Sequence, residues 1–166
     1  MPTLFWDASG LAKRYTAEVG SDVADALFAA VPATAMLTTV WGYAETFSIL
    51  LRGLNGGRLD PPTFATAFVA LRREIIGSPD IGFLAVDEAA VLAGLPLMQR
   101  HNINATDAAL LAVLLRYVLA HPVGASPCVL VAADKRLVRA AGTEGLLTLN
   151  PELIAARDVP AFLASI

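Results

Sequence analysis

Short apolar segments alternate with longer segments of helical pattern along the whole chain, and this alternation constrains the fold more than any other feature. The apolar segments are rich in β-branched or aromatic residues and cover residues 3–6, 33–37, 81–86, 128–133 and 146–150. Their length is typical of buried strands. The helical segments between them are long enough to be crossover connections, which join parallel strands. The sequence therefore predicts an α/β fold, a three-layer α/β/α sandwich with a mainly parallel central sheet.

The helices are expected at residues 8–16, 21–30, 39–54, 60–77, 87–100, 104–120 and 134–141, with a mostly helical tail after Pro151. Residues that favour helix starts, such as Ser21 and Asp60, stand where these helices begin. The segment 53–80 contains the glycines and prolines of a helical hairpin. A chain of 166 residues without repeats or linkers predicts one domain covering residues 1–166.

Composition excludes several classes of protein. Hydrophobic residues make up 56% of the chain and charged residues 16%, which is typical of a compact core. The net charge of −3 argues against a protein that coats duplex DNA. Cys128 is the single cysteine, so neither an internal disulfide nor a thiolate metal cluster can form, and we expect it to be a small core residue. His101 and His121 flank a helical segment without a partner at ligand spacing, which disfavours zinc.

The most apolar region, residues 108–134, is interrupted by Arg116, His121, Pro122, Gly124 and Pro127. It therefore lacks the roughly 18 continuous apolar residues that a membrane-spanning helix needs. The N-terminus has no basic segment followed by an apolar one, so no export signal is visible. We expect a cytoplasmic protein that does not enter a membrane.

Acidic residues directly follow several of the expected strands. Asp7, Asp87 and Asp134 stand at such positions, and Asp107 lies in the first turn of the very apolar helix 104–120. Ligands of open α/β sheets bind at the carboxyl ends of the strands, so these acids are expected near one edge of the sheet. A single acid of this kind is more often a helix cap than a catalyst, because such a side chain accepts hydrogen bonds from free backbone N–H groups.

Glu45 has a different interpretation from its local pattern. In the helix 39–54 the apolar positions 40, 44, 47, 51 and 54 form one face. Trp41, Glu45, Ser48 and Arg52 line a neighbouring face. Periodicity alone therefore predicts that Glu45 is a solvated residue near Arg52.

Several carboxylates at one edge raise one another's pKa unless a cation balances their charge. Oxygen-rich sites of this kind suit hard divalent ions such as Mg²⁺ or Mn²⁺. Their usual chemistry is to activate water and to neutralise charge at a phosphorus atom. Spacing in the sequence indicates an acidic metal site and goes no further.

Four segments in order resemble the sequence blocks of PIN-domain ribonucleases. They are "TLFWDASGLAKRYTAEVGS", "TTVWGYAETFSILLR", "NINATDAALLAVLL" and "VLVAADKRLVRAAGTEGL". The resemblance is strongest to the VapC-like toxins of bacterial VapBC-type toxin-antitoxin pairs and spans nearly the whole chain. It implies that Asp7, Glu45, Asp107 and Asp134 form the acidic site, and that Asp87 is only the cap of its helix.

The resemblance further implies an endoribonuclease that hydrolyses RNA phosphodiester bonds with Mg²⁺ or Mn²⁺. Asp7 and Asp107 are then expected as direct metal ligands. Glu45 would ligate the ion or position the water, and Asp134 would act through a bound water. The expected partners are an RNA substrate, a small cognate antitoxin protein and a second copy of the chain in a homodimer.

Residues around the acids allow two interpretations. Ser9 either hydrogen-bonds Asp7 or a phosphate, or caps the helix that follows the first strand. Lys13, Lys135 and Arg136 could bind the RNA backbone, although solvated surface positions are the simpler expectation. Many VapC-like proteins carry Thr or Ser two positions before the last acid, where this chain has Ala132, so another group would have to supply that hydrogen bond.

Two other classes of function stay open at this point. One is a non-catalytic PIN-like module that binds RNA or protein, although a binder has no need of four mutually repelling acids. The other is a different α/β enzyme. An aspartyl-phosphate phosphatase would carry a second Asp where Ser9 stands, and a nucleotide-binding protein would have a glycine-rich loop after a strand.

Overall fold

The computed structural model describes residues 1–121 and 126–166, so Pro122 and Gly124 lie outside the described residues. Its centre is a sheet of five strands in the order β3-β2-β1-β4-β5, and every pair of neighbours is parallel. The strands are β1 (Thr3–Trp6), β2 (Met36–Thr38), β3 (Gly82–Phe83), β4 (Cys128–Val131) and β5 (Leu147–Leu149). The fold class predicted from the sequence is confirmed.

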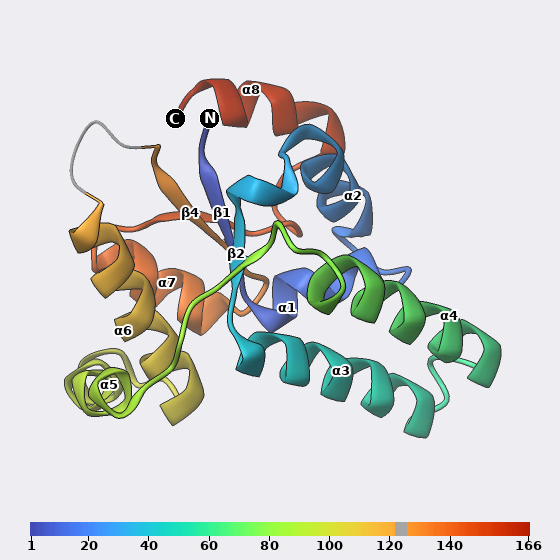
Figure 1. Ribbon diagram of the computed structural model, residues 1–166, viewed down its shortest axis with the longest axis horizontal. Coiled ribbons are helices and arrows are strands. Elements are labelled where there is room, and N and C mark those ends of the chain that lie inside the picture. The colour runs from blue at the N-terminus through green and yellow to red at the C-terminus, as the bar shows by residue number, and fades with distance from the viewer. Residues whose placement is uncertain (122–125) are drawn as a thin grey trace.

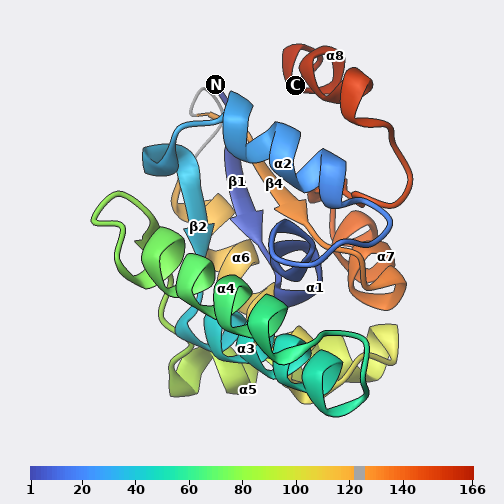
Figure 2. The ribbon, with the colours of Figure 1, turned by 90° about the vertical axis from the view of Figure 1, so that its right-hand side faces the viewer.

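The helices cover both faces of the sheet (Figures 1 and 2). They are α1 (Ala8–Leu11), α2 (Ser21–Ala30), α3 (Val40–Asn55), α4 (Pro61–Leu71), α5 (Glu88–His101), α6 (Ala105–Ala120), α7 (Lys135–Thr143) and α8 (Val159–Ala164). Single turns of other helix types occur at η1 (Ala12–Arg14), η2 (Ala33–Ala35), η3 (Arg72–Ile76) and η4 (Ala156–Asp158).

Alternate residues of the central strands point to opposite faces of the sheet and enter separate cores. Leu4 and Trp6 of β1 pack with α1 to α4 and α8, whereas Phe5 packs with α5, α6 and α7. Val131 and Leu130 of β4 divide between the two faces in the same way. Because both faces are covered, the strands are apolar throughout, as is usual for parallel sheets.

Four of the five expected strands are shorter than their apolar segments, and β2 and β3 depart most from the expected bounds. The segment 33–37 begins with the turn η2, and only Met36 and Leu37 pair with β1. Of the segment 81–86, only Gly82 and Phe83 pair with β2, at the edge of the sheet. Apolar residues beyond these pairs fill the cores from loops, so apolar character alone overestimated the strands.

The predicted helical hairpin is confirmed by α3 and α4 (Figure 2). The chain reverses tightly because Gly53 lies against Leu59, where an added Cβ would be 2.9 Å from a Leu59 methyl carbon. Asp60 then caps α4, accepting a hydrogen bond from the Thr63 N–H at 2.7 Å. Phe47 of α3 packs against Phe68 of α4 with their ring centres 4.9 Å apart.

The histidines and the cysteine have the roles expected from the sequence. His101 ends α5, and His121 caps α6 and stacks on Tyr117. Cys128 packs against the core, and burial raises the pKa of its thiol to about 12, which leaves it unreactive. In the described ranges no single helix is both long and apolar enough to cross a membrane; α5 and α6 reach that length only together and are bent by 113°.

Candidate active site

The carboxyl ends of the strands carry the acids predicted from the sequence. Asp7 follows β1 directly and caps α1, and Asp134 lies beyond the end of β4 and caps α7. Glu45 comes from the first half of α3, which starts just past β2 (Figure 1). Asp107 lies in the first turn of α6. Four different helices thus contribute one acid each.

Asp7 is held by Ser9. The carboxylate is only 5% exposed, and its Oδ2 accepts hydrogen bonds from the Ser9 N–H at 2.9 Å and from the Ser9 hydroxyl. Burial raises the pKa of Asp7, and the Ser9 hydrogen bonds act against that rise. Asp7 itself is the cap of α1, so the interpretation of Ser9 as the cap was wrong and its bond to Asp7 is confirmed.

Ser9 also joins β1 to the loop after β4. Its Oγ accepts hydrogen bonds from the N–H groups of Ala133 at 2.9 Å and Asp134 at 3.1 Å. A hydroxyl has one proton and two lone pairs, so this side chain is fully used. Ser9 therefore fixes the loop that follows Ala132 and supplies a hydroxyl group there.

The small residues after Asp7 have a steric cause. Gly10 lies so close to the end of β4 that an added Cβ would be 2.5 Å from the Val131 carbonyl oxygen. A larger residue would push α1 away from the sheet. The strand ends at Asp7 because the chain must turn there into a helix that touches the neighbouring strand.

Glu45 is not the solvated residue that periodicity predicted. The fully buried positions of α3 are Gly42, Thr46, Leu50 and Gly53, whereas Val40 is 60% exposed. The buried face is therefore rotated relative to the expected one, and Glu45 lies half-buried at its margin. Burial raises the pKa of Glu45, the Asp7 charge raises it further, and Arg52 lowers it.

Asp107 is positioned by the residue that caps its helix. Asn104 Oδ1 accepts the Asp107 N–H at 2.8 Å, and Asn104 Nδ2 donates to Asp107 Oδ2 at 2.8 Å. Burial, followed by the charges of Asp7, Asp134 and Glu45, raises the pKa of Asp107 to about 7. The other three predicted acids thus lie close enough for their charges to act on Asp107.

Asp134 and Asp87 cap helices in similar ways but have different surroundings. Asp134 Oδ1 accepts the N–H groups of Arg136 at 2.7 Å and Leu137 at 3.1 Å, and its charge also raises the pKa of Asp7. Asp87 accepts the Ala90 N–H at 2.9 Å, and both its oxygens lie 3.0 Å from Arg116 Nη1. The hydrogen bond from Ala90 and the Arg116 charge lower the pKa of Asp87. Its predicted role as a cap is confirmed.

The basic residues divide into a buried one and two exposed ones. Lys13 is 3% exposed, and its Nζ donates to the Val19 carbonyl and to Glu152 Oε1, both at 2.8 Å. The expectation of a solvated Lys13 was wrong, and its ammonium group is not available to RNA. Lys135 and Arg136 are exposed in the first turn of α7, beside Asp134.

The donor atoms of the acidic cluster suit a hard divalent cation, since all four side chains offer carboxylate oxygens. The pKa values of Asp7, Glu45 and Asp107 are raised by burial and also by neighbouring carboxylates, and that repulsion is the electrostatic cost that such a cation removes. Within residues 1–121 and 126–166, no three Asp, Glu, His or Cys side chains stand at ligating distance of one point. The cluster therefore fits Mg²⁺ or Mn²⁺ in chemistry and charge, and its side chains would have to close in around the ion.

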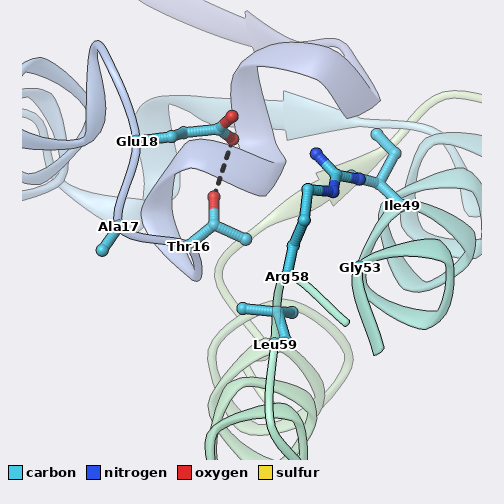
Figure 3. A pocket seen from close by; sticks show the side chains of 7 residues that line it. All are labelled: Thr16, Ala17, Glu18, Ile49, Gly53, Arg58 and Leu59. Atoms are coloured by element: carbon cyan, nitrogen blue, oxygen red, sulfur yellow. Dashed lines mark hydrogen bonds between the residues drawn. The ribbon is translucent and has the colours of Figure 1, made fainter. Parts of the chain in front are cut away.

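A separate pocket lies between the loop after η1 and the α3–α4 hairpin (Figure 3). Glu18 and Arg58 line it with Ile49 and Leu59, and the Thr16 hydroxyl donates to Glu18 at 2.7 Å. None of the four acids lines this pocket.

Solved structures share this arrangement of strands and helices. VapC20 of Mycobacterium tuberculosis, described as a sarcin-ricin loop cleaving toxin, superposes with a TM-score of 0.63 at 19% identity, over 90% of this chain and 100% of its own. The fold is a VapC-like PIN-domain fold. PAE2754 of Pyrobaculum aerophilum superposes with a TM-score of 0.61 at 16% identity, over 99% of this chain and 97% of its own. No family model and no curated protein matches the sequence. The PIN-domain likeness therefore rests on structure at low sequence identity.

Proposed function

We propose that the chain is a single-domain, metal-dependent endoribonuclease and the toxin of a toxin-antitoxin pair. The observation that carries this proposal is the set of four acids, Asp7, Glu45, Asp107 and Asp134, whose charges act on one another at the carboxyl edge of a PIN-domain fold. VapC20, which shares the fold, is described as a sarcin-ricin loop cleaving toxin. An RNA substrate and an antitoxin protein are the partners that follow, with the cytoplasm as the place of action.

In the proposed reaction, the acids would hold Mg²⁺ or Mn²⁺. Asp7 and Asp107 would be the direct ligands, Glu45 would complete the ligand set or orient the attacking water, and Asp134 would act through a bound water. A divalent cation bound there would supply charge neutralisation at the phosphate and lower the pKa of a water toward neutrality. In the hydrolysis the water oxygen forms a bond to phosphorus while the bond from phosphorus to the ribose oxygen breaks. The water gives up one proton and the departing ribose oxygen takes one up.

Two other groups of residues support the acids. Ser9 keeps the Asp7 and Asp134 loops at a fixed separation, because one hydroxyl bonds both. Lys135 and Arg136 lie exposed at the start of α7 and would bind phosphates of the RNA backbone. Their exposure next to Asp134 supports this role.

The proposed homodimer draws support from exposed apolar side chains on α5. Val91, Leu92 and Leu95 are 40%, 57% and 53% exposed, and contiguous apolar surface of this kind favours association. Light scattering of the wild type and of Leu92→Glu tests the dimer: a dimer that dissociates in the variant supports it, and a monomeric wild type contradicts it.

Cleavage of a panel of labelled RNAs in Mg²⁺, Mn²⁺ or EDTA tests the activity. We expect cleavage to require the metal, to be lost in Asp7→Asn and Asp107→Asn, and to persist in Asp87→Asn, whose side chain caps α5 and pairs with Arg116. Equal residual cleavage in all variants would indicate a contaminating nuclease. RNA binding by a wild type that neither binds metal nor cleaves would favour a non-catalytic RNA-binding module.

A further inference from the structure

The turn between α5 and α6 sets the position of Asp107. Asn104, which donates to the Asp107 carboxylate, follows a sharp change of direction after α5. Asn102 makes that change with a φ of 52°, the one positive φ of a residue other than glycine in the described part of the chain. Ile103, 6% exposed, then anchors the turn in the core. The position of Asp107 therefore depends on the contacts that hold the end of α5.

A cluster of charged side chains holds the end of α5 against α7. Glu144, just past α7, accepts at Oε1 from Arg100 Nη1 at 2.6 Å, and His101 Nε2 lies 2.6 Å from the same oxygen. The His101 side chain is 6% exposed and that of Glu144 is 17% exposed. Arg139, in the middle of α7, donates to the His101 carbonyl at 3.4 Å. The end of α5 is thus attached to α7 at two points.

These attachments connect two of the acids. The helix α7 begins at its cap Asp134, and the turn after His101 leads directly to Asp107. We propose that Glu144, acting with His101, is a positioning residue that fixes Asp107 relative to Asp134 and so sets the affinity of the acidic cluster for a divalent cation. This inference rests on the metal site of the proposed function. Glu144 contacts neither acid in this arrangement and acts only through the backbone.

The chain offers a matched control at the other end of the same helix pair. Asp87 at the start of α5 pairs with Arg116 of α6, so this pair also ties the two helices together. Arg116 lies nine residues beyond Asp107, about 13 Å along the helix at about 1.5 Å per residue. Loss of Asp87 should therefore affect stability without moving Asp107.

Calorimetric titration of the protein with Mn²⁺ alone tests the inference, with the melting temperature of each variant measured in EDTA. We expect Glu144→Ala to raise the Kd for Mn²⁺ about tenfold, the range found for groups that orient metal ligands. Glu144→Gln, which still accepts hydrogen bonds, should recover most of the affinity. Asp87→Ala should lower the melting temperature and keep the Kd within about twofold of the wild type.

Wild-type affinity in Glu144→Ala would overturn the inference, as would an equal loss in Asp87→Ala, because the affinity would then follow stability. If Glu144→Ala does not fold, Arg100→Ala replaces it, since the Arg100 side chain is 59% exposed and its removal leaves the core intact. A Kd for Mn²⁺ that stays at the wild-type value in Arg100→Ala would then overturn the inference. A wild type that binds no Mn²⁺ would refute the metal site itself, which distinguishes that failure from a failure of Glu144 alone.

Discussion

Replacing Asp107 by Asn should stabilise the metal-free protein at alkaline pH. The folded protein holds the pKa of Asp107 at about 7, whereas its ordinary value is 3.8, because burial and three neighbouring acids disfavour the charge. Between these values the folded state binds more protons than the unfolded state, so stability falls as the pH rises from about 4 to 7. Above about pH 7 the ionised Asp107 destabilises the folded protein to its full extent, and below about pH 4 this destabilisation is absent.

The size of this effect follows from the pKa shift and from the exposure of the group. Each pKa unit corresponds to about 1.4 kcal/mol. Because Asp107 is half-exposed, screening by solvent reduces the sum, and we expect a gain of about 1 to 2 kcal/mol in the free energy of unfolding of Asp107→Asn at pH 8. For a chain of this length, each kcal/mol raises the melting temperature by about 2–4 °C.

Urea denaturation in EDTA at pH 4 and pH 8 measures the effect. Asp107→Asn should be more stable than the wild type at pH 8 and equal to it at pH 4. Asp87→Asn is the control of opposite sign: its pKa is lowered in the folded protein, so its loss should destabilise at pH 8. Destabilisation of Asp107→Asn at pH 8, or the same effect at both pH values, would refute the argument from carboxylate repulsion.

The other predictions concern packing and the basic residues. Gly10→Ala should destabilise the protein by more than about 2 kcal/mol, because the new Cβ would overlap the backbone at Val131. Gly142→Ala, where the new Cβ meets open space, should stabilise the protein by up to about 1 kcal/mol. Urea denaturation measures both effects. Ser9→Ala should cost about 1–3 kcal/mol and most of the cleavage rate, since it leaves two loop N–H groups unpaired; unchanged cleavage would contradict its proposed role. Lys13→Ala should lower the free energy of unfolding by about 3 kcal/mol, because it removes a buried charge from its partners. Arg136→Ala should leave stability unchanged and reduce by about one the slope of the logarithm of the RNA-binding constant against the logarithm of salt concentration.

Local features of the sequence predicted much of the fold because their causes are local. The bounds of β1 and of α2, residues 3–6 and 21–30, match the expectation. The caps at Asp60 and Asp87 hold the helices that they were expected to start. Helix caps and strand periodicity depend on residues only a few positions apart, so the sequence alone is enough to predict them.

The environment of Glu45 and Lys13 was decided by tertiary structure. Periodicity counts apolar residues, but α3 buries Gly42, whose added Cβ would lie 2.8 Å from Thr38 Oγ1, because close approach requires a small residue there. That rotation brings Glu45 toward Asp7. Lys13 is buried because Glu152, far along the chain, comes beside it.

The sequence by itself determined the alternation of strands and helices, the acids after the strands and the caps that start the helices. It also supplied four blocks whose order resembles that of PIN-domain ribonucleases. Only the tertiary structure decided which acids lie at one edge of the sheet, which of them raise the pKa of a neighbouring acid, and which charged side chains are buried. The physical reason is that burial and electrostatic coupling depend on distances between segments far apart in sequence, which no local pattern contains.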